Sequence, residues 1–164
     1  MTNPNTPEPS PLPEETTRLL RHLLATIAYR ASQSLRDAPA RFENSRVSDG
    51  MTAGELVRHM TNVLAFAVAT LTQTERVRHE ALDWGGEVAR FYAILQTLDA
   101  RLEAGARVEA GLELRILQGP LADVLTHIGQ LHMLRRVAGA PVSSVNYVRA
   151  EISAGRIALD ALSD

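Results

Sequence analysis

Apolar residues recur at helical spacing in four long stretches of the chain. In the first, the spacing predicts a helix over about 14–36, with Arg and Ser on the opposite face. Its apolar positions are Leu20, Leu23, Leu24, Ile27, Ala31 and Leu35. We find neither an internal repeat nor a convincing stretch with the two-residue alternation of a strand.

The second helix has the clearest start signal. Thr52 and Glu55 have the spacing of a capping box, and Met51 with Leu56 can form the hydrophobic staple around it. The helix is therefore predicted to begin at Thr52 or Ala53. Its apolar stripe consists of Leu56, Met60, Val63, Ala67 and Leu71.

Two further helices follow. Asp83 can cap a third helix that ends at Gly105, and its apolar positions have the spacing of a bundle seam. A last helix is expected from about Leu112 to Ala138. Gly119-Pro120 interrupts that stretch, so the helix either begins afresh at Pro120 or is kinked there.

The predicted fold class is all-α: an antiparallel four-helix bundle with a short C-terminal helical tail. Residues 1–13 hold five of the eight prolines and are expected to be a disordered or extended leader. The bundle would occupy 14–139, and 140–164 would be a tail packing on the bundle, with one short amphipathic helix from Tyr147.

Composition excludes several kinds of chemistry. The chain has no cysteine, which excludes disulfides, thiolate nucleophiles and Cys-based zinc sites, and all 17 basic residues are Arg, which excludes a Schiff-base lysine. The net charge of −2 disfavours nucleic-acid binding. Apolar runs are too short for a membrane span, and the first residues lack the features of a signal peptide, so we expect a cytoplasmic protein.

The most informative polar residues lie in the last predicted helix. Asp123, His127 and Gln130 fall on one face, and an Asp and a His at positions i and i+4 can reach one ion because such side chains lie about 5–6 Å apart. His132 points about 140° away from His127 and is expected at the surface or an interface. His22 and His79 are expected at the surface.

His59, at the core edge of the second helix, could supply a third ligand. Two His and one carboxylate leave coordination positions open, as catalytic sites do. Glu55, one turn before His59, is better explained by the capping box than as a ligand. A hydrogen-bonded pair of Asp123 and His127 without metal remains an alternative, and bis-His haem ligation by His59 and His127 is a weaker one.

The segments ELVRHM, with His59, and DVLTHIGQL resemble the DinB/YfiT-like superfamily of metal-binding four-helix bundles, over about 19–139. The more specific element is His127-Ile128-Gly129-Gln130. The resemblance implies a divalent transition metal (Zn, Ni, Fe or Mn) bound by His59, position 123 and His127. Position 123 is Asp here, whereas the family pattern has His. Gln130 could hold His127 or a substrate by a hydrogen bond, or it could pack against a neighbouring backbone.

Relatives in this superfamily include S-transferases and isomerases that use low-molecular-weight thiols such as bacillithiol or mycothiol, and metal-dependent hydrolases. The resemblance thus implies an enzyme acting on a small-molecule substrate with an activated thiol or water; the catalytic residues beyond the ligands are not identified. The alternative is a non-catalytic dimeric bundle or a small-ligand-binding protein without metal. A homodimer is the default expectation. Asn146, Tyr147 and Arg149 either line a cleft or pin the tail to the bundle.

Overall fold

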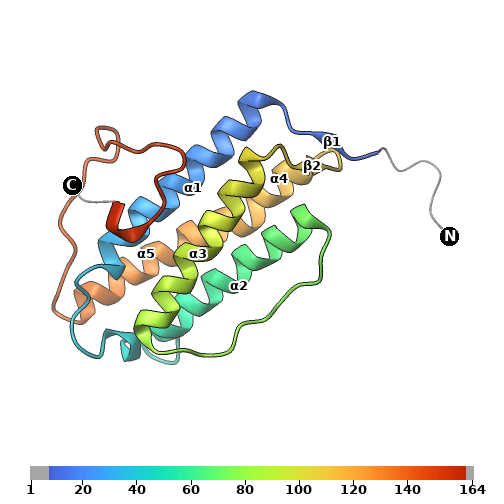
Figure 1. Ribbon diagram of the computed structural model, residues 1–164. Helices are drawn as coiled ribbons and strands as arrows, with labels where there is room; N and C mark the ends of the chain where they lie inside the picture. Colours follow the sequence, from blue (N-terminus) through green and yellow to red (C-terminus); the bar gives the residue numbers. More distant parts are fainter. Residues whose placement is uncertain (1–7, 162–164) are drawn as a thin grey trace.

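The computed structural model describes residues 8–161 and is mainly helical, which confirms the all-α prediction. Four long helices dominate it (Figure 1). They are α1 (Glu14–Leu35), α2 (Ala53–Thr72), α3 (Trp84–Glu103) and α5 (Ala122–Val137). The short elements are β1 (Ser10–Pro11), η1 (Phe42–Asn44), β2 (Arg107–Val108), α4 (Leu112–Ile116), η2 (Leu117–Leu121) and η3 (Leu159–Ala161).

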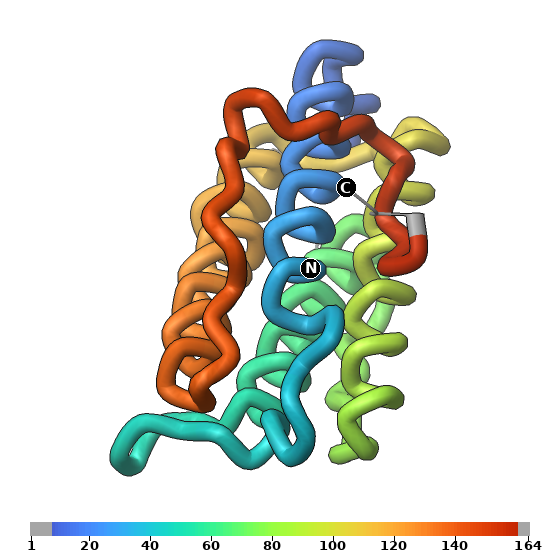
Figure 2. The backbone as a smooth tube through the Cα atoms, turned by 90° about the vertical axis from the view of Figure 1, so that its left-hand side faces the viewer, coloured from blue at the N-terminus to red at the C-terminus, as the bar shows by residue number. Residues whose placement is uncertain are grey.

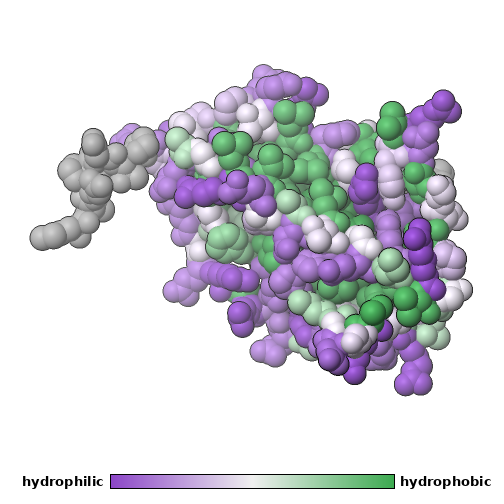
Figure 3. All heavy atoms as spheres, turned by 180° about the vertical axis from the view of Figure 1, so that it is seen from behind, coloured by the Kyte–Doolittle hydropathy of each residue, from purple (hydrophilic) through white to green (hydrophobic). Residues whose placement is uncertain are grey.

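The four long helices lie side by side, α1 and α2 each packing against both α3 and α5. The enclosed core is mostly aliphatic, and the predicted apolar stripes supply much of it. Its fully buried members include Leu24, Ile27, Met60, Leu64, Phe91, Leu95 and Leu131. On the rear face, apolar side chains form separate areas divided by hydrophilic ones (Figure 3).

The helix directions correct the expected antiparallel arrangement, because α2 and α3 run the same way (Figures 1 and 2). Arg58, early in α2, lies 3.9 Å from Glu87, early in α3. Segment 73–83, here called the crossover segment, returns along the length of α2. About eleven extended residues reach roughly 36 Å, enough to pass a 20-residue helix about 30 Å long.

Local signals place the helix starts correctly. The Thr52 hydroxyl accepts a hydrogen bond from Glu55 N at 3.2 Å, and Glu55 Oε2 accepts one from Thr52 N at 2.8 Å. The Asp83 side chain accepts a hydrogen bond from Gly86 N at 2.7 Å. Both caps satisfy N–H groups that the first helical turn leaves free, so α2 and α3 begin where the sequence predicted.

The last helix is continuous through Gly119-Pro120, with a π-helical turn at Leu117–Leu121. A π turn is wider than an α turn and so accommodates the proline, which has no N–H to donate. The helix therefore does not begin afresh at Pro120, and in place of the expected kink the structure has a π-helical turn there. The helix presents Asp123 in the first turn of α5.

The described part of the predicted leader includes β1, where Ser10 and Pro11 pair antiparallel with Val108 and Arg107. The sequence did not predict this two-residue strand, which is too short to show an alternating pattern. Residues 1–7 of the leader lie outside the described residues. Within the described range, no helix is both long and apolar enough to cross a membrane.

The predicted helix from Tyr147 is wrong. In its described part the tail has turns at 147–149 and 154–155 and a short 3-10 helix, η3, and it runs along α1 (Figure 2). Tyr147 packs edge-on against Tyr29 and lies under Arg30, whose guanidinium carbon is 3.9 Å from the ring centroid. Gly155, with φ of +81°, ends any helical path. The tail is thus held by contacts with α1 and not by helical hydrogen bonds, and Tyr147 anchors the tail to α1.

Candidate metal centre

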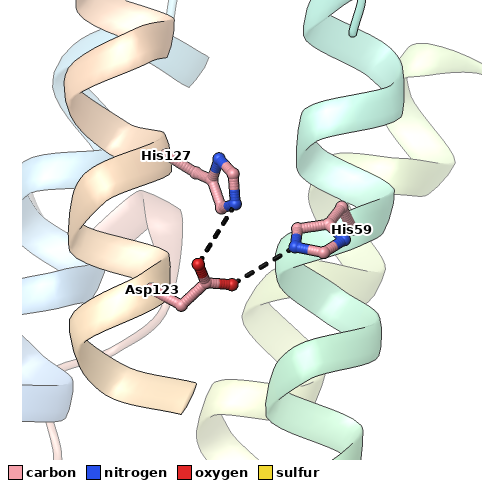
Figure 4. A group of neighbouring side chains, drawn as sticks. All are labelled: His59, Asp123 and His127. Carbon is pink, nitrogen blue, oxygen red and sulfur yellow. Dashed lines mark hydrogen bonds and ion pairs between the residues drawn. The ribbon is translucent and has the colours of Figure 1, made fainter. Parts of the chain in front are cut away.

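Three predicted site residues come together between two helices. His59 projects from α2, and Asp123 and His127 project from successive turns of α5 (Figure 4). Each offers a ligand atom, and these atoms lie within 4.8 Å of one another. Since α2 and α5 pack directly, the helix contact itself brings residues 64 positions apart into one cluster.

Asp123 lies between the two imidazoles. Its Oδ2 is 3.2 Å from His59 Nε2 and its Oδ1 is 3.5 Å from His127 Nε2. The two rings meet edge-to-face, with centroids 4.7 Å apart. Because the carboxylate contacts both rings, the geometry disfavours the bis-histidine haem alternative, which would need iron between those nitrogens.

His127 is the most enclosed member of the cluster, and His59 and Asp123 are more exposed. The His127 side chain is 12% exposed, whereas His59 and Asp123 are 38% and 43% exposed. A ligand or water can therefore approach past His59 and Asp123, whereas most of the His127 side chain is covered by neighbouring residues.

Gln130 determines how His127 presents its two nitrogens. His127 Nδ1 lies 2.8 Å from Gln130 Oε1, an atom that only accepts hydrogen bonds, so Nδ1 is the donor. In a neutral imidazole the other nitrogen, Nε2, then carries a lone pair. That lone pair faces the Asp123 carboxylate, so two acceptor atoms face each other, and a cation between them would make the contact favourable.

Three clefts meet at the cluster, each lined by one of its members. His59 lines a polar cleft of about 720 Å³ that also holds four arginines. Asp123 lines a cleft of about 580 Å³ between Phe66 and Pro120. His127 and Gln130 line a mainly apolar cleft of about 380 Å³. These volumes are within the range of small-molecule sites.

Neither His22 nor His132 is part of this group, and His79 lines the same polar cleft as His59 without joining the cluster. His22 is exposed, and His79 is half-buried, its backbone N–H donating to Asn62 Oδ1 at 3.0 Å. His132 is half-buried against α1, with Nε2 donating to the carbonyl of Arg30 at 3.3 Å. Glu55 remains in the capping box. The contact of His132 with α1 places it inside the helix packing, where the sequence suggested a surface or interface.

Sequence reasoning missed the arginines beside His59. Arg46, Arg58, Arg76 and Arg78 come from the loop before α2, from α2 and from the crossover segment. They share no spacing, because only the path of the crossover segment brings them together. In comparisons with models of known families, with curated proteins and with solved structures, nothing matches this chain.

Proposed function

We propose that this protein is a metal-dependent enzyme of the DinB-like type, built on a four-helix bundle, in which His59, Asp123 and His127 bind a divalent transition metal. The observation that carries the proposal is the contact between His127 Nε2 and Asp123 Oδ1. Because His127 Nδ1 donates its hydrogen bond to Gln130, the lone pair of Nε2 faces the carboxylate oxygen, and both atoms are acceptors. A cation shared by both atoms makes that contact favourable.

The donor set fits such an ion. Ligands about 2.0–2.2 Å from a tetrahedral ion lie about 3.4 Å from one another. The distances from His59 Nε2 to Asp123 Oδ2 and from His127 Nε2 to Asp123 Oδ1, 3.2 and 3.5 Å, lie close to that separation, and with one ligand atom from each residue the three atoms lie within 4.8 Å of one another. Two imidazoles and one carboxylate suit Zn, Ni, Fe or Mn and leave positions free for a substrate.

A bound ion of this kind supplies Lewis acidity, which lowers the pKa of a thiol or a water and so makes a nucleophile available. This chain has no cysteine, so a thiol would have to come from a small co-substrate, such as a low-molecular-weight thiol. Gln130 holds the His127 ring and thereby directs Nε2 toward the site. The greater exposure of His59 and Asp123 leaves the approach for that nucleophile.

The DinB-like resemblance supports the same set of residues. The resemblance includes the HIGQ element, with its Gly between Ile128 and Gln130. In the structure, Gln130 of this element contacts His127. The departure at position 123 replaces a neutral nitrogen ligand by a charged oxygen. We therefore expect the metal preference to shift toward the harder ions among the four.

One observation favours a second candidate, a non-catalytic dimeric bundle or small-ligand-binding protein without metal. The Asp123 carboxylate contacts both imidazoles directly, at 3.2 and 3.5 Å, so contacts among the three side chains are a metal-free explanation of the cluster. The two candidates differ in metal content, which makes them separable by one measurement.

The test is elemental analysis of tag-free protein after purification and after separate reconstitution with Zn, Ni, Fe and Mn. We expect about one metal per chain, lost in His127→Ala and retained in the control His22→Ala, which alters an exposed histidine on α1. Equal metal content in His127→Ala and the unaltered protein, or no metal after all four reconstitutions, would contradict the enzyme proposal and favour the metal-free candidate.

A further inference from the structure

The cleft beside His59 is rich in arginine. We call it the arginine cleft and define it by Arg46, Arg58, Arg76 and Arg78. Arg76 and Arg78 come from the crossover segment, which is held against α2 by the hydrogen bond from His79 N to Asn62 Oδ1. Arg76 also lies over the ring of Phe66 on α2, 5.6 Å from its centroid. These anchors hold the crossover segment where its arginines line the same cleft as His59.

Not every arginine of this cleft has a carboxylate partner. Asp49, Glu55 and Glu80 also line the cleft, and Arg58 lies 3.9 Å from the buried carboxylate of Glu87. The Glu55 carboxylate accepts a hydrogen bond from Thr52 N, and its hydrogen bonds with Thr52, together with the charges of Arg58 and Arg46, hold its pKa below the usual value. Arg46, Arg76 and Arg78 form no ion pair with any of the residues that the structure describes, so their planar forks are available to bind carboxylate or phosphate in a bidentate manner.

On the other side of the cluster the surroundings change. The cleft lined by His127 is formed largely by Val47, Met51, Leu56, Met133 and Leu134. Met51 and Gly50 line both this cleft and the arginine cleft, so the two are neighbours. A molecule lying across the cluster would meet guanidinium groups at one end and methionine and aliphatic side chains at the other.

We propose that the substrate carries an oxyanion, either a carboxylate or a phosphate ester, that binds in the arginine cleft, and an apolar group that binds beside Met51 and Met133. This inference rests on the proposed function, because it places the reacting atom between those two groups, at His59, Asp123 and His127. It also specifies an anion site that is formed by the chain's own side chains, independently of any metal.

The test measures binding of octanoate, octyl phosphate and neutral octanamide by calorimetry, to metal-free and to zinc-treated protein. The key variant is Arg76→Gln/Arg78→Gln, and the matched control is Arg101→Gln/Arg149→Gln, which removes two exposed arginines outside the cleft. We expect one or both anions to bind more tightly than octanamide. The key variant should raise the Kd of that anion about tenfold, the loss expected for a charge-assisted hydrogen bond, and the control should not.

The outcomes separate the possibilities. Tighter binding of octyl phosphate identifies a phosphate ester, and tighter binding of octanoate identifies a carboxylate. Arginine-dependent binding to protein that takes up no metal would refute the proposed function and keep the anion site. Equal binding of octanamide, no binding of either anion, or an unchanged Kd in the key variant would overturn the inference.

Discussion

Gln130 Oε1 accepts a hydrogen bond from His127 Nδ1 at 2.8 Å, within one turn of α5. This bond fixes which nitrogen of His127 faces Asp123. Residues that orient a metal ligand in this way typically change metal affinity 10- to 100-fold when removed. We therefore expect Gln130→Ala to weaken metal affinity by about that factor, measured by competition with a chromophoric chelator.

Two variants control this prediction. Gln130→Glu keeps an oxygen acceptor for His127 Nδ1 and should keep most of the affinity. Gln96→Ala removes an exposed glutamine on α3 and should change nothing. If Gln130→Ala binds metal as tightly as Gln96→Ala, Gln130 does not position His127.

His132 should make stability depend on pH. Burial lowers the pKa of His132 from its usual 6.5; the nearby Arg30, Arg136 and Arg135 lower it further, and the hydrogen bond to the Arg30 carbonyl acts in the opposite direction. The unfolded chain therefore takes up this proton first as the pH falls. The stabilisation is complete above about pH 6.5 and is lost as the pH falls toward the folded-state pKa.

The measurement is urea unfolding of the unaltered protein and of His132→Gln at pH 7.5, 6.5 and 5.5. The stability advantage of the unaltered protein should shrink as the pH falls. His22→Gln, which alters an exposed histidine, should leave the pH dependence unchanged. A constant difference between the unaltered protein and His132→Gln across this range would show that His132 does not contribute.

The parts of the fold that were predictable from sequence depend on short-range interactions. Thr52 and Glu55 are three residues apart and form the capping box at the start of α2 without help from the rest of the chain. The direction of α3 was not predictable, because it depends on the crossover segment, which has no periodic pattern. The contact between Arg58 and Glu87, which is possible only because the two helices run the same way, joins residues that are 29 positions apart in the chain.

The candidate site divides in the same way. Asp123, His127 and Gln130 lie within two turns of one helix, so their spacing alone placed them on one face. His59 could be proposed as a partner only because two helices of a bundle pack together, supported by the resemblance. The arginine cleft had no signal at all, since its side chains meet only once the loop before α2 and the crossover segment have taken their paths.

Arg135 links α5, α1 and the start of the tail. Its side chain is buried and donates to the carbonyls of Ala140, Ser34 and Arg36 at 2.8, 3.1 and 3.0 Å. Burial lowers the pKa of this guanidinium. Arg135→Ala leaves three carbonyls without their donor, and we expect a loss of about 2–3 kcal/mol in the free energy of unfolding.

The matched control for this prediction is Arg136→Ala, which removes the exposed neighbouring arginine and should cost less than about 0.5 kcal/mol. Both variants are compared by urea denaturation monitored by circular dichroism. Arg135→Lys should recover only part of the loss, because one ammonium cannot reproduce the fork that reaches all three carbonyls. Equal stability of Arg135→Ala and Arg136→Ala would contradict the role assigned to Arg135.

Glu87 stabilises the parallel pairing of α2 and α3. Its carboxylate is buried, pairs with Arg90, lies 3.9 Å from Arg58 and accepts a hydrogen bond from Leu82 N, at the end of the crossover segment, at 2.9 Å. Glu87→Gln preserves size and the acceptor for Leu82 N but leaves Arg90 unpaired. Since breaking a buried ion pair from one side is costly, we expect a loss of about 3 kcal/mol in the free energy of unfolding, measured by urea denaturation.

Replacing both partners, in Glu87→Met/Arg90→Met, should recover most of the lost stability because the pair leaves no uncompensated charge. Glu75→Ala, at an exposed position of the crossover segment, serves as the control. A Glu87→Gln protein as stable as this control would show that the charge of Glu87 is not needed to hold α3 beside α2.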